Sequence, residues 1–243
     1  MTHKPSSSKQ EDFGGSDLLA ELAGEATQKL KAFQTAELDH QARSEGLSTA
    51  LKNIFQFFNP FSTHLNRIKP VIARTYYADP IAMYSNLQWG DAYTDYRKQS
   101  LAESAFFDHV SFRVRLTAAN PMIVKRRWNE VETLKKELDA FGLRTLDDLD
   151  EVVRGKPKQE FFEVALAPDF LMHIQFQGNY DTGKIDLLCN NFDGFGLASY
   201  LLDPETVNQQ LLDEIGRFLI GRKDSLPSLL SSTRYLPKQA IYR

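Results

Sequence analysis

The feature that most constrains the fold is a change in the spacing of apolar residues near Pro60. From Asp17 to about Phe58 they recur every three or four residues, which is typical of one face of an α-helix. Beyond Pro60 several segments alternate apolar and polar residues, which is typical of half-buried strands. The order predicts an N-terminal helical arm at residues 16–59 and an α+β domain at residues 60–243.

The ends of the arm are predicted from local signals. Residues 1–15 are rich in Ser, Lys and Gly, and we expect a disordered tail there. Ser16 can cap the helix, Gly46 predicts a break or kink, and Asn59-Pro60 predicts its end. Packing on its own domain is the expected role of the arm, and a homodimer formed through this helix is the alternative.

Four strands are predicted after the arm, near residues 65–77, 82–89, 92–98 and 107–117. The last is clearest, because Val110, Phe112, Val114 and Leu116 alternate with polar residues. Asp79-Pro80 and Gly90-Asp91 supply turns. These strands and the helix that follows form one block, residues 60–143.

A second block is predicted at residues 144–222. The preceding helix begins at Asn120-Pro121 and ends at Gly142. A short helix near residues 146–153 follows, then strands in "EFFEVALA", "FLMHIQFQ" and "KIDLLCNN", then a helix from Asp203-Pro204 to Gly221. The C-terminal tail is irregular. Short connections between strands predict a largely antiparallel sheet covered on one face by helices.

Composition narrows the classes of protein. The chain has 243 residues, 42% of them hydrophobic, and its net charge of −3 gives no overall attraction to polyanions. With one cysteine, Cys189, we expect no internal disulfide and a reducing, cytoplasmic location. The histidines show no metal-ligand spacing, and no apolar run is long enough for membrane insertion. We therefore expect no metal and no cofactor.

Two segments resemble ligand-binding loops only in part. "GNYDTGKI" (Gly178–Ile185) matches a phosphate-binding loop except at Ile185, but a strand-like segment follows where that loop requires a helix. We predict a hairpin turn. "CNNFDG" lacks two ligands of a calcium loop, since Cys189 and Tyr200 occupy their positions, and we predict a polar turn.

Basic and aromatic residues gather in the first block. Alternation predicts that one outer sheet face carries Arg74, Tyr76, Tyr84, Tyr93, Arg97, His109, Arg113 and Arg115. Nearby, "VKRRW" places Lys125, Arg126 and Arg127 in the first turns of the predicted middle helix. Such side chains can bind acidic peptide or stack nucleobases, and an ordinary solvated face with cross-strand charge pairs is the plainer interpretation.

Three functions remain open. The first is a non-catalytic protein-interaction or assembly module that binds another protein through the sheet face. The second is a nucleic-acid-binding accessory protein that uses the same residues. The third is an enzyme with His109 or His173 as an acid/base group beside Asp108 or Asp169. No catalytic motif favours this third hypothesis, and we assign no catalytic residues.

Overall fold

The computed structural model describes residues 17–100, 102, 105–155 and 160–235. The expected N-terminal tail at residues 1–15 lies outside them, as do residues 236–243 of the C-terminal tail. Helix α1 (Asp17–Ile68) comes first. The chain divides into two compact units, Met1–Arg43 and Ser44–Arg243, so α1 contributes to both.

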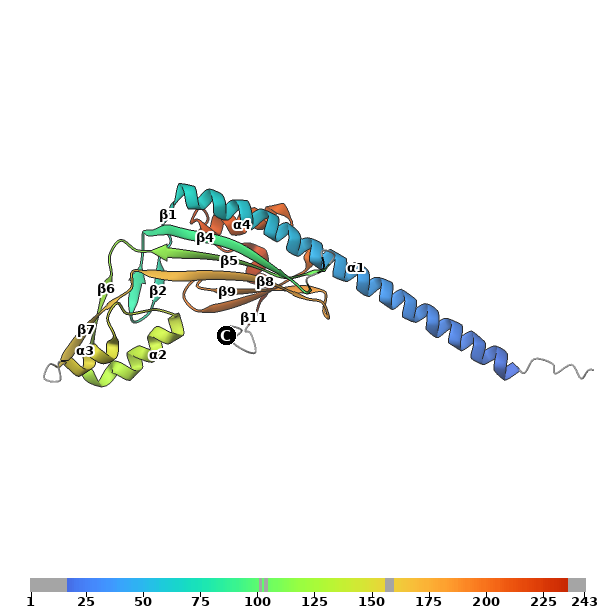
Figure 1. Cartoon of the computed structure of the whole chain (residues 1–243), viewed down its shortest axis with the longest axis horizontal. Helices are drawn as coiled ribbons and strands as arrows, with labels where there is room; N and C mark the ends of the chain where they lie inside the picture. The colour runs from blue at the N-terminus through green and yellow to red at the C-terminus, as the bar shows by residue number, and fades with distance from the viewer. Residues whose placement is uncertain (1–16, 101, 103–104, 156–159, 236–243) are drawn as a thin grey trace, which may run out of the picture. The chain divides into compact units, whose positions relative to one another are not determined.

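The second unit is built on one antiparallel sheet, which confirms the predicted α+β class (Figure 1). Within the described residues its strand order is β1-β4-β5-β8-β9-β10-β11. The strands are β1 (Val71–Ile72), β4 (Leu87–Lys98), β5 (Phe107–Thr117), β8 (Asp169–Asn179), β9 (Lys184–Asn190), β10 (Leu197–Leu202) and β11 (Arg234–Tyr235). Strands from both predicted blocks thus share one sheet.

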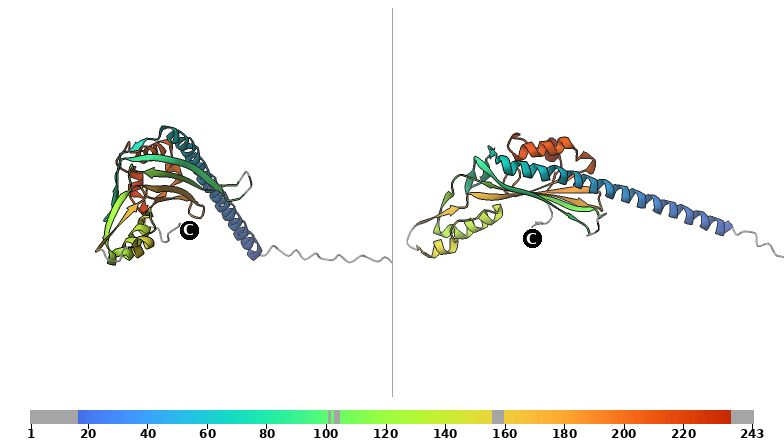
Figure 2. Two further views of the ribbon diagram at one scale, coloured as in Figure 1. Left: turned by 60° about the vertical axis from the view of Figure 1, so that its left-hand side comes forward. Right: turned by 45° about the horizontal axis from the view of Figure 1, so that its top comes forward.

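One face of this sheet is covered by the part of α1 that follows Ser44 and by α4 (Gln209–Leu219), as both views in Figure 2 agree. Phe58 of α1 lies 5.1 Å from Phe112 and 5.7 Å from Phe176, ring centre to ring centre. A Cβ at Gly216 of α4 would lie 3.1 Å from the ring of Phe61. The apolar side of the strands therefore packs under two helices.

Smaller elements complete the unit. Two further pairs of strands form, β2 (Tyr76–Ala78) with β3 (Ala82–Tyr84) and β6 (Met122–Arg127) with β7 (Phe161–Leu166). The remaining helices are η1 (Trp128–Glu130), α2 (Val131–Phe141), α3 (Leu149–Gly155), η2 (Pro204–Thr206) and α5 (Ser228–Ser232).

The predicted end of the first helix at Asn59-Pro60 is wrong, and so is the break at Gly46, because α1 continues through both to Ile68. Pro60 removes one backbone donor. Beyond it Leu65 is buried, and Asn66 bonds to the sheet, so tertiary contacts outweigh the local preference.

The predicted helix start at Asn120-Pro121 is also wrong. Residues Met122–Arg127 form β6, and the helix begins only at Val131. β6 is held by pairing with β7, some forty residues along the chain, which no local signal reveals. Similarly, the two strands predicted on either side of Gly90-Asp91 are one strand, β4, with a bulge between Trp89 and Ala92. Strand β10 was not predicted.

The hairpin prediction for "GNYDTGKI" is confirmed. β8 ends at Asn179 and β9 begins at Lys184, without an intervening helix. Gly183 has φ +69°, and its N–H donates to the carbonyl of Asn179 at 2.8 Å. Glycine suits this turn because its backbone tolerates positive φ.

Candidate functional site

The candidate site is the face of the large sheet that points away from α1 and α4. Residues directly opposite one another in an antiparallel sheet point to the same side, so the register defines this face. Three transverse rows cross it. They are Tyr93–Arg113–His173–Asn190–Leu197, Asp95–Ser111–Gln175–Leu188–Ser199 and Arg97–His109–Gln177–Asp186–Leu201. We call this surface the polar sheet face.

The polar sheet face has a buried floor and an exposed rim. Its floor consists of Ser111, His173, Leu188 and Ser199. Apolar side chains remain exposed around them: Tyr93, Leu171, Leu197 and Leu201 are between 37% and 52% exposed. Leu171 belongs here because it stands opposite Arg115. The polar sheet face therefore presents apolar and polar side chains side by side at its exposed rim.

Charges on and beside this face are balanced. The Nη2 atom of Arg113 lies 4.0 Å from Oδ2 of Asp95 across the β4–β5 pair. Arg115 forms an ion pair with Asp169, which also accepts from Arg144 at 3.1 Å. These carboxylates offset the guanidinium groups, so the face presents mixed charge and not a continuous cationic surface.

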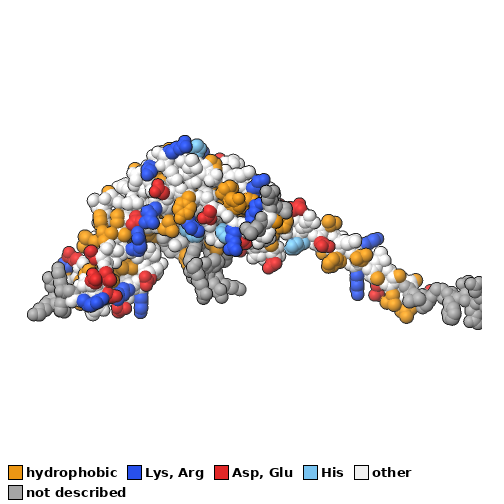
Figure 3. All heavy atoms as spheres, in the orientation of Figure 1, with side chains coloured by type: hydrophobic (Ala, Val, Ile, Leu, Met, Phe, Trp, Pro, Cys, Tyr) orange, Lys and Arg blue, Asp and Glu red, His pale blue; other side chains and the backbone are white. Residues whose placement is uncertain are grey.

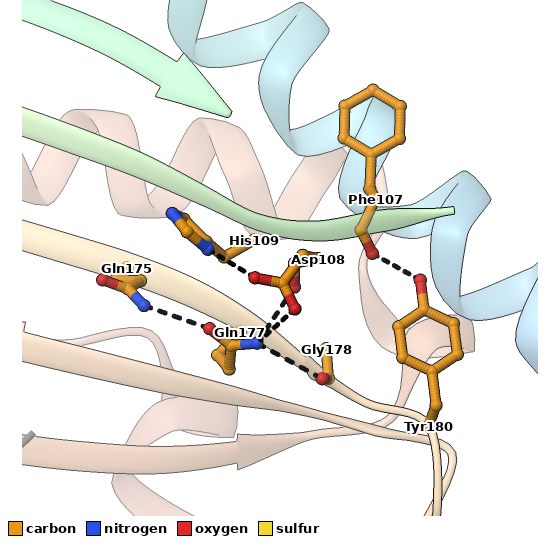
Figure 4. Close-up of polar contacts among 7 residues, drawn as sticks. All are labelled: Phe107, Asp108, His109, Gln175, Gln177, Gly178 and Tyr180. Carbon is orange, nitrogen blue, oxygen red and sulfur yellow. Dashed lines mark hydrogen bonds and ion pairs between the residues drawn. The ribbon is translucent and has the colours of Figure 1, made fainter. Parts of the chain in front are cut away.

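A polar network occupies one end of the face (Figure 4). Asp108 Oδ2 lies 2.9 Å from Nδ1 of His109. Gln177 Nε2 donates to Asp108 Oδ1 at 3.2 Å, and Gln175 Nε2 donates to Gln177 Oε1 at 3.1 Å. A carboxylate at Nδ1 orients the imidazole and leaves Nε2 as the nitrogen that is available for proton transfer. The hydroxyl of Tyr180 donates to the carbonyl of Phe107 beside this network.

The two histidines of the face lie in different rows. His173 stands opposite Arg113, whereas His109 stands opposite Gln177. Burial, reinforced by the positive charge of Arg113, lowers the pKa of His173 to about 4, so this imidazole is neutral at pH 7. The buried hydroxyl of Ser111 has no hydrogen-bond partner among the described residues.

Four of the predicted site residues lie together. Tyr93, Arg97, Arg113 and Arg115 share the polar sheet face, as alternation predicted. Arg113 lies 5.9 Å from the centre of the Tyr93 ring, within the range of a cation–π contact.

The placement predicted for Tyr76 and Tyr84 is wrong. They face each other in the β2–β3 pair and are fully buried, because their rings pack on Phe170 and Phe195. Burial raises the pKa of each to about 12. The Tyr76 hydroxyl donates to Phe192 O and that of Tyr84 to Ala167 O.

Arg74 is also away from the predicted face. Its guanidinium lies 3.5 Å above the Phe218 ring centre and donates to the backbone carbonyls of Phe192 and Phe218. It therefore ties the β1–β2 connection to α4 and to the loop after β9.

The cations of "VKRRW" lie on β6 and not on a helix. Lys125, Arg126 and Arg127 line a hollow of about 540 Å³ together with Phe161. Lys125 pairs with Glu163 at 3.4 Å and Arg126 with Glu137 at 3.9 Å. These residues are not part of the polar sheet face.

Several members of the face were missed from the sequence. Gln175, Gln177, Leu171 and Asn190 come from β8 and β9, whereas the predicted site residues came from the first block. Alternation in "FLMHIQFQ" identifies their strand and spacing, but only the β5–β8 register shows that they lie beside Arg113 and His109.

The "CNNFDG" segment is a turn stabilised by Asn191. This residue has φ +56°; its Nδ2 donates to Leu171 O, and its Oδ1 accepts from Gly196 N–H, both at 2.9 Å. Across the described parts of the chain, no three His, Cys, Asp or Glu side chains gather as a metal site would require. None of the helices described has the length and apolar character needed to cross a bilayer.

Comparisons with protein families, with curated proteins and with solved structures found no match.

Proposed function

We propose that this protein is a non-catalytic interaction module that binds another protein through the polar sheet face. The observation that carries the proposal is the exposed apolar rim of Tyr93, Leu171, Leu197 and Leu201 around a polar floor. Burying these side chains against a partner would be favourable at about 25 cal/mol per Å² of apolar area. A reducing cytoplasmic location suits the buried Cys189, which forms no disulfide with the described residues, and is part of the same proposal.

Charge balance favours a protein over a nucleic acid as the partner. A phosphate backbone requires several cations free to replace its counterions. On this face Arg113 faces Asp95, and Arg115 is paired with Asp169. A folded protein surface, which presents both signs of charge, is the better complement.

The proposal is tested by placing a photo-crosslinking amino acid at Leu197 in the full chain and irradiating cells that produce it. A discrete protein adduct that survives nuclease treatment is expected, and Leu201→Glu should abolish it. The same crosslinker at Ile123, which is 63% exposed on β6 away from the face, is the matched control. Equal labelling from both positions, or none from Leu197, contradicts the proposal.

Binding to oligonucleotides distinguishes the protein-binding module from the alternative, a nucleic-acid-binding accessory protein. Weak binding that changes little with salt is expected of wild-type protein. Tight binding that falls steeply with salt and is lost in Arg97→Glu would instead support the accessory protein that contacts phosphates.

A second candidate function rests on the Asp108–His109 contact. A carboxylate at 2.9 Å from Nδ1 is the arrangement that orients a general acid or base. This candidate predicts turnover of a substrate from a panel of esters, phosphate esters and peptides, with loss in His109→Asn and retention in His64→Asn. No turnover across the panel would favour the binding module.

A further inference from the structure

Several large apolar side chains are exposed on α1 before Ser44. Leu18, Leu22, Leu30, Phe33 and Leu38 are each between 50% and 67% exposed there. Figure 3 shows hydrophobic side chains along this part of the helix. Exposure of so many large apolar groups within one short segment is typical of an interaction surface.

Four residues form a stripe, which we call the arm stripe: Leu22, Ala26, Leu30 and Phe33. At 100° per residue they fall within an arc of about 80°. Leu38 lies on a different side of the helix. A second series with steps of three and four residues follows along α1 at Leu47, Leu51, Ile54 and Phe58, where the side chains are fully buried in the second unit. The helix therefore carries one apolar stripe that is covered and another that is not.

Charge argues against a lipid surface as the cover of the arm stripe. Across residues 17–43 five carboxylates outnumber three cations, a net charge of −2. Helices that lie on anionic membranes are rich in Lys and Arg on their polar side. A helix from a protein is the better complement.

The arm stripe is complementary to itself in the antiparallel direction. Pairing about Ala26 sets Leu22 against Leu30 of a second copy and brings the two Ala26 residues together, where small side chains permit close approach. Lys29 lies about 20° and Glu25 about 60° beyond the same edge of the stripe, so in an antiparallel pair the Glu25 of one copy and the Lys29 of the other lie on the same side and within about one turn of each other. In a parallel pair they would face Thr27 and Gln34 instead, without charge attraction.

We propose that the arm stripe pairs with the arm stripe of a second copy of this chain as an antiparallel helix pair. This proposal is independent of the polar sheet face. Because the paired segment is short, we expect a dimer that dissociates on dilution.

Sedimentation equilibrium of the full chain tests the association. Wild-type protein should show a concentration-dependent monomer–dimer equilibrium, and Leu30→Glu should weaken it by about tenfold or more. Leu38→Glu is the matched control, because Leu38 is at least as exposed (67%, against 58% for Leu30) but lies off the stripe. Circular dichroism verifies that each variant remains folded. A chain that stays monomeric, or equal loss in both variants, overturns the proposal; binding of that monomer to anionic vesicles would indicate a lipid surface.

Charge reversal and crosslinking test whether the two helices pair in the antiparallel direction. Glu25→Lys should weaken the dimer, and adding Lys29→Glu to the same chain should restore it. In a Cys189→Ala background, mixed Leu22→Cys and Leu30→Cys chains should form a 22–30 adduct with a short bifunctional maleimide. Adducts only between identical positions would show a parallel pair and overturn the antiparallel arrangement.

Discussion

Asn66 of α1 forms two hydrogen bonds with the backbone of Ala92 on β4. Its Nδ2 donates to the Ala92 carbonyl at 2.6 Å, and its Oδ1 accepts from the Ala92 N–H at 2.7 Å. β1 pairs with β4 only at Leu87 and Gln88, so beyond these residues a side-chain amide takes the place of a neighbouring strand at Ala92.

Asn66→Ala should lower the free energy of unfolding by about 2 kcal/mol, because both backbone groups lose their partner. Denaturant titration followed by circular dichroism measures the change. Asn53→Ala is the control, since Asn53 is exposed on the same helix and the exchange has the same effect on helix propensity. Similar values for the two variants would show that the Ala92 contacts contribute little.

We expect Arg74 to stabilise the fold and not to bind a partner. Arg74→Ala is expected to lower the free energy of unfolding by about 3 kcal/mol, because two backbone carbonyls lose a charged donor and the Phe218 ring loses its cation. Arg74→Lys should recover only part, since an ammonium lacks the planar fork of donors. As a control, Arg67→Ala at an exposed position should change the free energy of unfolding by no more than about 0.5 kcal/mol. A stable Arg74→Ala variant with impaired partner binding would instead restore its predicted binding role.

Two glycines should respond oppositely to alanine. At Gly90 a Cβ would lie 2.6 Å from the Arg115 carbonyl oxygen, so Gly90→Ala should lower the free energy of unfolding by about 2 kcal/mol. Gly46 has nothing within 4 Å of such a Cβ and lies inside α1, so Gly46→Ala should stabilise by about 0.5–1 kcal/mol. Thermal unfolding of both variants provides the measurement, and a shift of the same sign in both would refute this account.

The sequence predicted those elements in which the alternation of apolar and polar residues matches the buried and exposed sides. In β5, Val110, Phe112, Val114 and Leu116 are all fully buried, and the predicted limits at residues 107–117 agree with the structure. A strand with neighbours on both sides and helices on one face has one apolar side along its whole length, which is why the alternation is readable.

Elements held by distant partners were misassigned. β6 depends on β7, and the last turns of α1 depend on contacts with β4, such as that of Asn66 with Ala92. For the site, alternation placed Tyr93, Arg113 and their neighbours on one face correctly. It placed Tyr76 on the same face, although this residue belongs to another pair of strands. Membership of a sheet depends on pairing, and pairing is not a local property of the sequence.

Stability should fall in mild acid because of His173. Burial, with the charge of Arg113, lowers its pKa to about 4 in the folded protein, whereas an unfolded histidine titrates near 6.5. The unfolded chain therefore binds more protons between these values, so this stabilisation is complete above pH 6.5 and is lost as the pH falls to 4, up to about 3 kcal/mol. His173→Gln should flatten the pH dependence of the free energy of unfolding in that window, whereas exposed His64→Gln should leave it intact. An unchanged slope in His173→Gln would mean that the imidazole titrates normally in the folded protein.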